Sequence, residues 1–279
     1  MLCWTLTGAS DSQGPTSVHE FGFLAGLPRT GSTLLTCLIG QNPDVHVSGG
    51  SPLARLMFGA HDVCETYARE GLVRVRRTDF TDVLVSEIPR LYYQDIEQRY
   101  ILEKDRAWAH DPLGFLNKIT DNPRVIVLLR SIPEIMQSFV HVKVNNGDVL
   151  PERDLLVQGV DPLLDALRNT VKALEGGDDR FLFGTYDQLI RDPEGFTRAV
   201  YGHFGWDWFE HDFNHVDDLH LEDDASEHSE GLHDVRQTIE RRALTTRVSA
   251  GLMRQAEEYD EVLWKQVQVS LRNTPHRHF

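Results

Sequence analysis

A strand, a glycine-containing loop and a helix follow one another between residues 21 and 41, and this pattern restricts the possible folds most. The apolar run Phe21–Ala25 predicts a buried strand, and an apolar helix is expected from Thr33. The loop between them, Gly26–Ser32, follows a GxxxxG spacing, and hydroxyl residues come after its second glycine. Glycine tolerates backbone angles closed to other residues, so successive N–H groups can turn toward an anion, and the helix N-terminus adds its positive dipole end. The segment therefore predicts a phosphate-binding loop.

This loop lacks the lysine with which P-loop NTPases reach the β- and γ-phosphates of ATP. Ser32 stands at that position, and Arg29, which precedes the second glycine, is the only cation in the loop sequence. The loop therefore favours an anion other than the polyphosphate tail of ATP.

The length and charge of the chain limit its organisation and its partners. A chain of 279 residues can bury a core of its own, and we assign residues 21–279 to a single domain after a flexible leader, residues 1–20. The formal net charge of −15 argues against nucleic acid and against an anionic membrane as partners. No apolar run approaches the roughly 18 residues of a membrane span.

Cysteine usage indicates the cellular compartment. Three cysteines, Cys3, Cys37 and Cys64, are too few for a disulfide framework, and the first twenty residues do not have the pattern of a secretory signal. We therefore expect a protein of the reducing cytoplasm.

Apolar strands alternate with helices along the rest of the chain, which predicts an α/β protein with a central parallel sheet between helices. Strands are expected at Val45–Val47, Tyr100–Asp105, Arg124–Leu129 and Phe181–Thr185. Helical spacing occurs over residues 53–70, 80–100, 162–176 and 193–204, and in two stretches after residue 235. The polar residues 145–161 are expected to form a loop, and helices to start at Asp111-Pro112, Asp161-Pro162 and Asp192-Pro193.

Charged and polar residues follow two of these strands directly. Lys104 and Asp105 end one strand, where ligands of open α/β sheets bind; the alternative is a surface ion pair. Arg130 follows another strand, and Ser138 lies one or two turns into the next helix. These two residues can converge on one phosphate, because arginine offers a fork of donors and serine one more. The alternative is that Ser138 only caps a helix or faces solvent.

Residues 210–234 are rich in acidic residues and histidine. A metal site is one interpretation, but apart from His211 and His215 the histidine spacings form no helical pair with a third ligand nearby. We interpret the segment as a solvated acidic loop, and we assign no metal ligands.

The motifs described above, in this order, resemble those of sulfotransferases that use 3′-phosphoadenosine 5′-phosphosulfate (PAPS). Pro28–Leu35 is similar to the family's 5′-phosphosulfate loop, and Val125–Ser138 to its 3′-phosphate motif. Tyr186–Leu189 is similar to a family segment whose tyrosine lies at the nucleotide, and Leu102–Asp105 resembles a strand end of the tyrosylprotein enzymes. The resemblance covers residues 21–208 and is closest to bacterial single-domain sulfotransferases.

The resemblance implies a nucleotide-kinase-like α/β core, PAPS as co-substrate and 3′,5′-adenosine bisphosphate (PAP) as product, with no required metal. It implies that Arg130, Ser138 and Tyr186 bind the nucleotide, and that Arg29 and Lys104 stabilise the transferring group. The residues that it assigns to the 5′-phosphosulfate are Arg29, Thr30, Gly31, Ser32, Thr33 and Leu34.

The general base does not follow from the resemblance. Cytosolic members use a histidine on the middle strand, and tyrosylprotein enzymes a glutamate after the phosphate helix, where this chain has Ser48–Ser51 with two glycines between. Our candidates are Asp105, His110 and, behind them, His46.

The sequence also bears on the acceptor and leaves two alternative functions open. We expect a neutral or cationic small molecule with a hydroxyl or amine as acceptor, while the oligomeric state stays open. The alternatives are a P-loop kinase that uses ATP and a nucleotide-binding protein of the same fold without catalysis.

Overall fold

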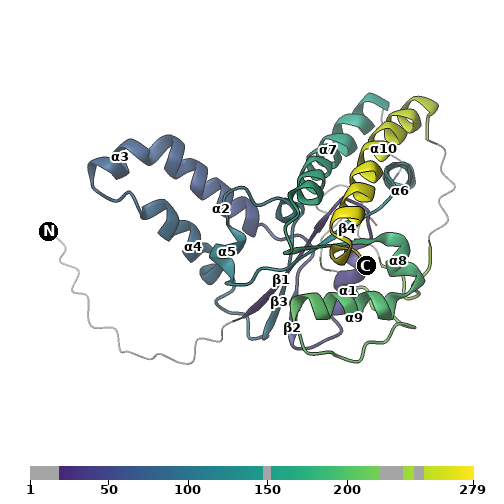
Figure 1. Ribbon diagram of the computed structural model, residues 1–279, viewed down its shortest axis with the longest axis horizontal. Helices are drawn as coiled ribbons and strands as arrows, with labels where there is room; N and C mark the ends of the chain where they lie inside the picture. The colour runs from purple at the N-terminus through teal and green to yellow at the C-terminus, as the bar shows by residue number, and fades with distance from the viewer. Residues whose placement is uncertain (1–18, 147–151, 220, 222–234, 242–247) are drawn as a thin grey trace.

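The computed structural model describes residues 19–146, 152–219, 221, 235–241 and 248–279 (Figure 1). In this part of the chain the sheet has five strands, all paired in parallel, in the order β2-β3-β1-β4-β5. The strands are β1 (Glu20–Gly26), β2 (Val45–Val47), β3 (Tyr100–Lys104), β4 (Val125–Leu129) and β5 (Phe181–Thr185). The predicted α/β class and parallel sheet are confirmed.

The strand order places β1 at the point where the chain changes direction across the sheet. From β1 the chain goes to β2 and β3 on one side, and later to β4 and β5 on the other. Ligands of open α/β sheets bind beyond the carboxyl ends of the strands at such a point. The loop after β1, the end of β3 and the end of β4 therefore meet at one edge of the sheet.

One face of the sheet is covered by helices α1, α8 and α9. These helices are α1 (Ser32–Ile39), α8 (Tyr186–Arg191) and α9 (Pro193–Phe204). Leu24, Leu102 and Ile126 point to this face and pack with Leu38 of α1 and Val200 of α9. The alternation of side chains along each strand divides the apolar residues between this face and the other.

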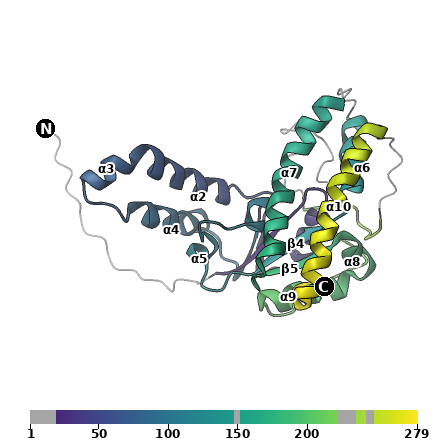
Figure 2. The same cartoon turned by 45° about the horizontal axis from the view of Figure 1, so that its top comes forward.

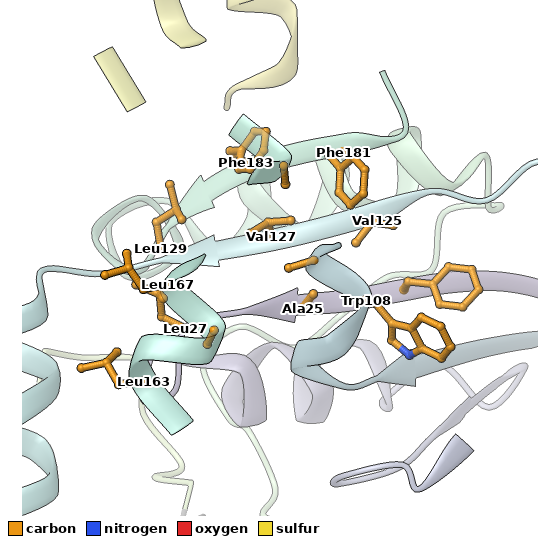
Figure 3. Close-up of a cluster of buried hydrophobic side chains, with 14 of the residues drawn as sticks. Ala25, Leu27, Trp108, Val125, Val127, Leu129, Leu163, Leu167, Phe181 and Phe183 are labelled. Carbon is orange, nitrogen blue, oxygen red and sulfur yellow. The ribbon is translucent and has the colours of Figure 1, made fainter. Parts of the chain in front are cut away.

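The opposite face packs against α6 (Ile132–Asn145), α7 (Glu152–Gly176), α10 (Ala250–Asn273) and the 3₁₀ turn η2 (Arg106–Ala109). Figure 3 shows this core, in which the strand residues Ala25 and Val127 lie beside Leu163 and Leu167 of α7 and Trp108 of η2. The sheet therefore lies between two helical layers, as predicted.

A helical arm, residues 53–92, extends away from the sheet in both views (Figures 1 and 2). It consists of α2 (Leu53–Asp62), a π-helical segment η1 (Val63–Ala68), α3 (Arg69–Arg74) and α4 (Phe80–Tyr92). The short α5 (Leu116–Ile119) lies beside α4, and η3 (Pro275–Arg277) follows α10.

Several predicted boundaries were wrong. Residues 145–161 are not a loop, because α7 begins at Glu152 and passes through Asp161-Pro162, while residues 147–151 lie outside the described part. Apolar residues continue at helical spacing on both sides of Pro162, and this periodicity outweighs the start signal of the proline. The helix expected over 80–100 ends at Tyr92, so that Tyr100 can open β3.

The other differences concern helix starts and the C-terminal third. Asp111 precedes α5 by several residues, yet its carboxylate accepts the N–H groups of Phe115 (2.6 Å) and Leu116 (3.2 Å), as a cap would. After residue 235 there is one long helix, α10, rather than two, in the part that the structure describes. Of the predicted leader and the acidic loop, residues 1–18, 220 and 222–234 lie outside the described part, and residues 210–219 contain neither helix nor strand.

Across the described residues, we find no helix with the length and apolar character that crossing a membrane requires.

Candidate active site

The loop after β1 has the backbone conformation that an anion site needs. Gly26 and Gly31 have positive φ angles of 125° and 84°, and a side chain at Gly26 would overlap the backbone of Leu128 in β4. Helix α1 begins at Ser32, one residue earlier than predicted, and no side chain caps its first N–H groups. These groups are the orphan donors of a helix N-terminus and point toward the end of the sheet.

Within this loop, Thr30 has a structural role through its hydroxyl. The side chain is fully buried, and its hydroxyl donates to the carbonyl oxygen of Leu27 at 2.8 Å. Of the predicted donor-binding residues, Thr30 can therefore offer a ligand its backbone N–H, while its hydroxyl braces the loop. Leu34 is on α1 and packs against the core of that face.

The two predicted phosphate motifs lie against each other. The Nε of Arg29 donates to the hydroxyl of Ser138 at 3.0 Å, and Arg130 donates to the carbonyl oxygen of Arg29 at 2.8 Å. The guanidinium carbon of Arg130 lies 4.1 Å from the centre of the Tyr186 ring. A side chain at Gly31 would lie 2.9 Å from the same ring, so this position needs glycine for its contact as well as for its φ angle. Residues from three separate motifs thus form one cationic site.

Three charged residues around Arg130 were missed by the sequence analysis. Glu134 accepts from the Nε of Arg130 at 3.0 Å, and Arg241 bridges Glu134 (2.5 Å) and Asp187 (3.0 Å). Glu134 lies in the first turn of α6, whereas Arg130 precedes that helix, so the helical i,i+4 rule does not predict this ion pair. Arg241 has no local sequence signal, because only the fold brings it to α6 and α8.

Lys104 reaches the phosphate loop from the neighbouring strand. It pairs in register with Leu24 of β1, and its Nζ lies 3.4 Å from the hydroxyl oxygen of Thr33 in the first turn of α1. The cationic groups of Arg29, Lys104 and Arg130 therefore meet around the N-terminus of α1, at the carboxyl edge of the sheet.

Of the three candidate bases, Asp105 lies closest to Lys104 along the chain, as the next residue. Its carboxylate accepts the N–H of Ala107 at 2.7 Å and thereby caps η2, and burial raises its pKa above the ordinary value. His110 follows η2, and burial together with Lys172 of α7 lowers its pKa. His46 pairs with Ile101, three residues before Lys104, and burial together with His19 lowers its pKa. Asp105 therefore directly follows β3, whereas His110 follows η2 and His46 lies within β2.

A buried acid, Glu103, was also missed. Its carboxylate accepts from the hydroxyl of Tyr93 in a short hydrogen bond and from the Nε1 of Trp108 at 3.2 Å, and the hydroxyl of Ser51 is also bonded to it. Burial raises the pKa of Glu103, while these donors act in the opposite direction. Its position inside an apolar strand was the available signal.

Groups of acidic, histidine or cysteine residues that could hold a metal ion are not found among the described residues.

The comparisons with known proteins agree with this geometry. The model of the family described as "Sulfotransferase family" matches residues 23–210, a range that contains the loop, Lys104, Arg130, Ser138 and Tyr186. The chain is 23% identical over 186 residues to protein-tyrosine sulfotransferase 1 of Danio rerio, and 21% identical over 194 residues to protein-tyrosine sulfotransferase 2 of Gallus gallus. These alignments cover 64% and 67% of this chain and 51% of each relative, so the chain spans about half the length of the curated relatives it matches.

A solved sulfotransferase structure from Alicyclobacillus acidocaldarius has the same fold. The two structures superpose with a TM-score of 0.51 at 11% sequence identity, and the superposition covers 91% of this chain and 96% of the solved chain. The fold therefore defines this chain as a P-loop-like α/β protein. Because the family model matches more than half of the chain, this protein belongs to the sulfotransferase family.

Proposed function

We propose that this protein transfers the sulfuryl group of PAPS to a hydroxyl or amine of a small-molecule acceptor. The observation that supports this function best is the joining of the phosphate loop to the second motif, through the bonds from Arg29 to Ser138 and from Arg130 to the carbonyl of Arg29. PAPS carries phosphate at both the 5′ and the 3′ position, so a donor site needs two anion sites held at a fixed distance.

The donor would lie across both anion sites. The loop and the first turn of α1, with the hydroxyls of Ser32 and Thr33, would hold the 5′-phosphosulfate, while Arg130 and Ser138 would hold the 3′-phosphate. Arginine suits that role because its planar fork matches phosphate oxygens. The Tyr186 ring, which lies against Arg130, would orient the nucleotide.

The reaction would follow the logic of phosphoryl transfer, in line and with negative charge spread over the equatorial oxygens. Lys104, Arg29 and the N–H groups of α1 would lie where that charge develops, and preorganised donors of this kind contribute a large part of catalysis. Asp105 would take the proton of the acceptor, since its raised pKa makes it a better base than an exposed aspartate. The cationic side chains supply the charge that a metal provides in kinases.

The preferred acceptor is neutral or cationic, because the chain has a net charge of −15 and would repel an acidic substrate. We also propose that the reaction takes place in the reducing cytoplasm, because three cysteines are too few for a disulfide framework. The two described cysteines, Cys37 and Cys64, are free thiols.

Thermal unfolding with nucleotides tests the donor site, because a ligand that binds the native state raises the midpoint. We expect PAP to stabilise the protein, and ADP or ATP with Mg²⁺ to have a smaller effect. Arg130→Ala should reduce the response to PAP to that given by AMP. Arg198→Ala is a matched control, since Arg198 also pairs with a glutamate one turn away (2.8 Å) and lies over an aromatic ring (3.9 Å), but on α9. Stabilisation by ATP with Mg²⁺ alone would instead support a kinase.

Turnover then distinguishes an enzyme from a binding protein. PAPS should be converted to PAP faster in the presence of one member of a panel of phenols, alcohols and amines than without it. PAP binding without turnover on any acceptor would support the binding protein.

A further inference from the structure

Glu103 lies one residue before Lys104 on β3, and its side chain points to the other face of the sheet. It is fully buried in the core that contains Ile101 and Trp108, whereas Lys104 reaches Thr33 on the α1 face. A carboxyl group at such a position is costly, and an apolar residue of similar size would usually serve packing better. The hydrogen bonds of Glu103 therefore have a use beyond filling the core.

These hydrogen bonds connect β3 to three segments that are far apart in the sequence. Tyr93 directly follows α4 as its C-cap, Trp108 belongs to η2, and Ser51 precedes α2. Each supplies a neutral donor, and the negative charge of Asp105 also acts on Glu103 and raises its pKa. The carboxylate thus joins the arm, the turn after β3 and the segment 48–52 at one point.

Ser51 is attached to two consecutive residues of β3. Its N–H donates to the carbonyl oxygen of Lys104 at 3.0 Å, and its hydroxyl is bonded to Glu103. The same hydroxyl accepts the N–H of Leu53 at 3.1 Å, at the start of α2. Because Gly49 and Gly50 precede Ser51 and leave the backbone free to adopt many conformations, these bonds decide where the segment passes the end of β3.

We propose that Glu103 is a positioning residue, which through Ser51 holds segment 48–52 as the acceptor-side wall next to Lys104. This inference rests on the proposed function, because segment 48–52 lines an acceptor site only if the protein transfers a sulfuryl group. It assigns to Glu103 no contact with donor or acceptor. Loss of the carboxylate should therefore loosen the wall and slow transfer, while the donor site on the other side of β3 keeps its affinity.

Hydrogen–deuterium exchange and steady-state kinetics of the whole chain test this proposal. In Glu103→Gln we expect exchange at Ser51 and Leu53 to rise about tenfold or more, since local opening determines exchange rates. The PAP-induced rise in the unfolding midpoint should equal that of the wild type. The kinetic readout is the release of PAP from PAPS, with water as the acceptor if no member of the panel reacts. In Glu103→Gln the kcat of this reaction should fall about tenfold while the KM for PAPS stays unchanged, because small misplacements of reacting groups are costly.

Two further variants separate positioning from general stability. Trp108→Phe removes a different hydrogen bond to the same carboxylate, one that comes from η2, so it should lower the unfolding midpoint but leave exchange at Ser51 and Leu53 within about twofold of the wild type. Ser51→Ala removes the hydroxyl that bonds to Glu103, but it also removes the acceptor of the Leu53 N–H, so the readout is exchange at residue 51, whose N–H bond to Lys104 the substitution keeps. This variant should show the faster exchange at residue 51 and the kcat effect, even if Glu103→Gln does not fold. Unchanged exchange at residue 51, or faster exchange with an unchanged kcat, would overturn the proposal. Failure of the wild type to bind PAP would instead overturn the proposed function, while the exchange data would still test the role of Glu103.

Discussion

Arg130 shows how one side chain can be fixed in place before a ligand arrives. It is only 8% exposed, and its guanidinium group is held by the carbonyl of Arg29, the carboxylate of Glu134 and the ring of Tyr186. A side chain held in this way loses little conformational entropy on binding. Arg130 is therefore held in one position, as the proposed binding of a 3′-phosphate requires.

Asp105 allows the base to be tested without loss of the turn that it caps. In Asp105→Asn the side-chain oxygen can still accept the N–H of Ala107, because asparagine caps about as well as aspartate, but the base is lost. We expect the rate of sulfuryl transfer to fall about 10²- to 10⁴-fold, the usual contribution of a general base. PAP should still raise the unfolding midpoint as in the wild type.

Rates of transfer across a pH range would check this assignment. A variant that keeps the wild-type rate would show that the base is elsewhere, and His110→Gln and His46→Gln would then be the next variants to measure.

At the scale of the elements, the ends of β3 and β4 were predictable, whereas their cross-connections were not. An apolar run followed by Lys104, or by Arg130, identifies a strand and the group at its carboxyl end from sequence alone. The conformation of Thr30 was not predictable, because a hydroxyl in such a loop can bond either to a ligand or to the loop itself. Arg241 and Glu103 act through contacts between distant segments, which local patterns do not contain.

The last turn of the chain gives a prediction on pH. His278 stacks on Phe183 of β5 and bonds to Ser270 of α10 at 3.0 Å, and burial, with a smaller effect of Arg277, lowers its pKa to about 4. Because the folded state disfavours the charged ring, the stability that it contributes is complete above the ordinary value of 6.5 and is lost as the pH falls through about 4.

The free energy of unfolding of the wild type and of His278→Gln should therefore converge between pH 6.5 and 4. Urea denaturation at a series of pH values measures this difference. Curves that run parallel over that range would show that His278 is not held neutral by the fold.

At the scale of the whole molecule, the arm and the sheet differ in how they are stabilised. The strand β4 is buried along its whole length, whereas α3 has no buried residue, and Tyr67 and Val75 of the arm are largely exposed. Stability within one protein follows buried contacts, so the outer part of the arm should open at a lower free energy than the sheet.

Native-state hydrogen exchange at increasing denaturant tests this difference. Amides in residues 63–78 should exchange through local openings at low denaturant, while those of β4 should require global unfolding. Equal opening free energies in the two regions would mean that the arm and the sheet unfold as one unit.

One site should bind two separated phosphates, and a comparison of PAP with AMP by calorimetric titration tests this most directly. The two ligands differ only in the 3′-phosphate. We predict that the wild type binds PAP at least about tenfold more tightly than AMP, since a charged hydrogen bond contributes about 1.5–3 kcal/mol. This preference should disappear in Arg130→Ala and persist in Arg198→Ala. An equal affinity for PAP and AMP in the wild type, or a preference that survives in Arg130→Ala, would contradict the account.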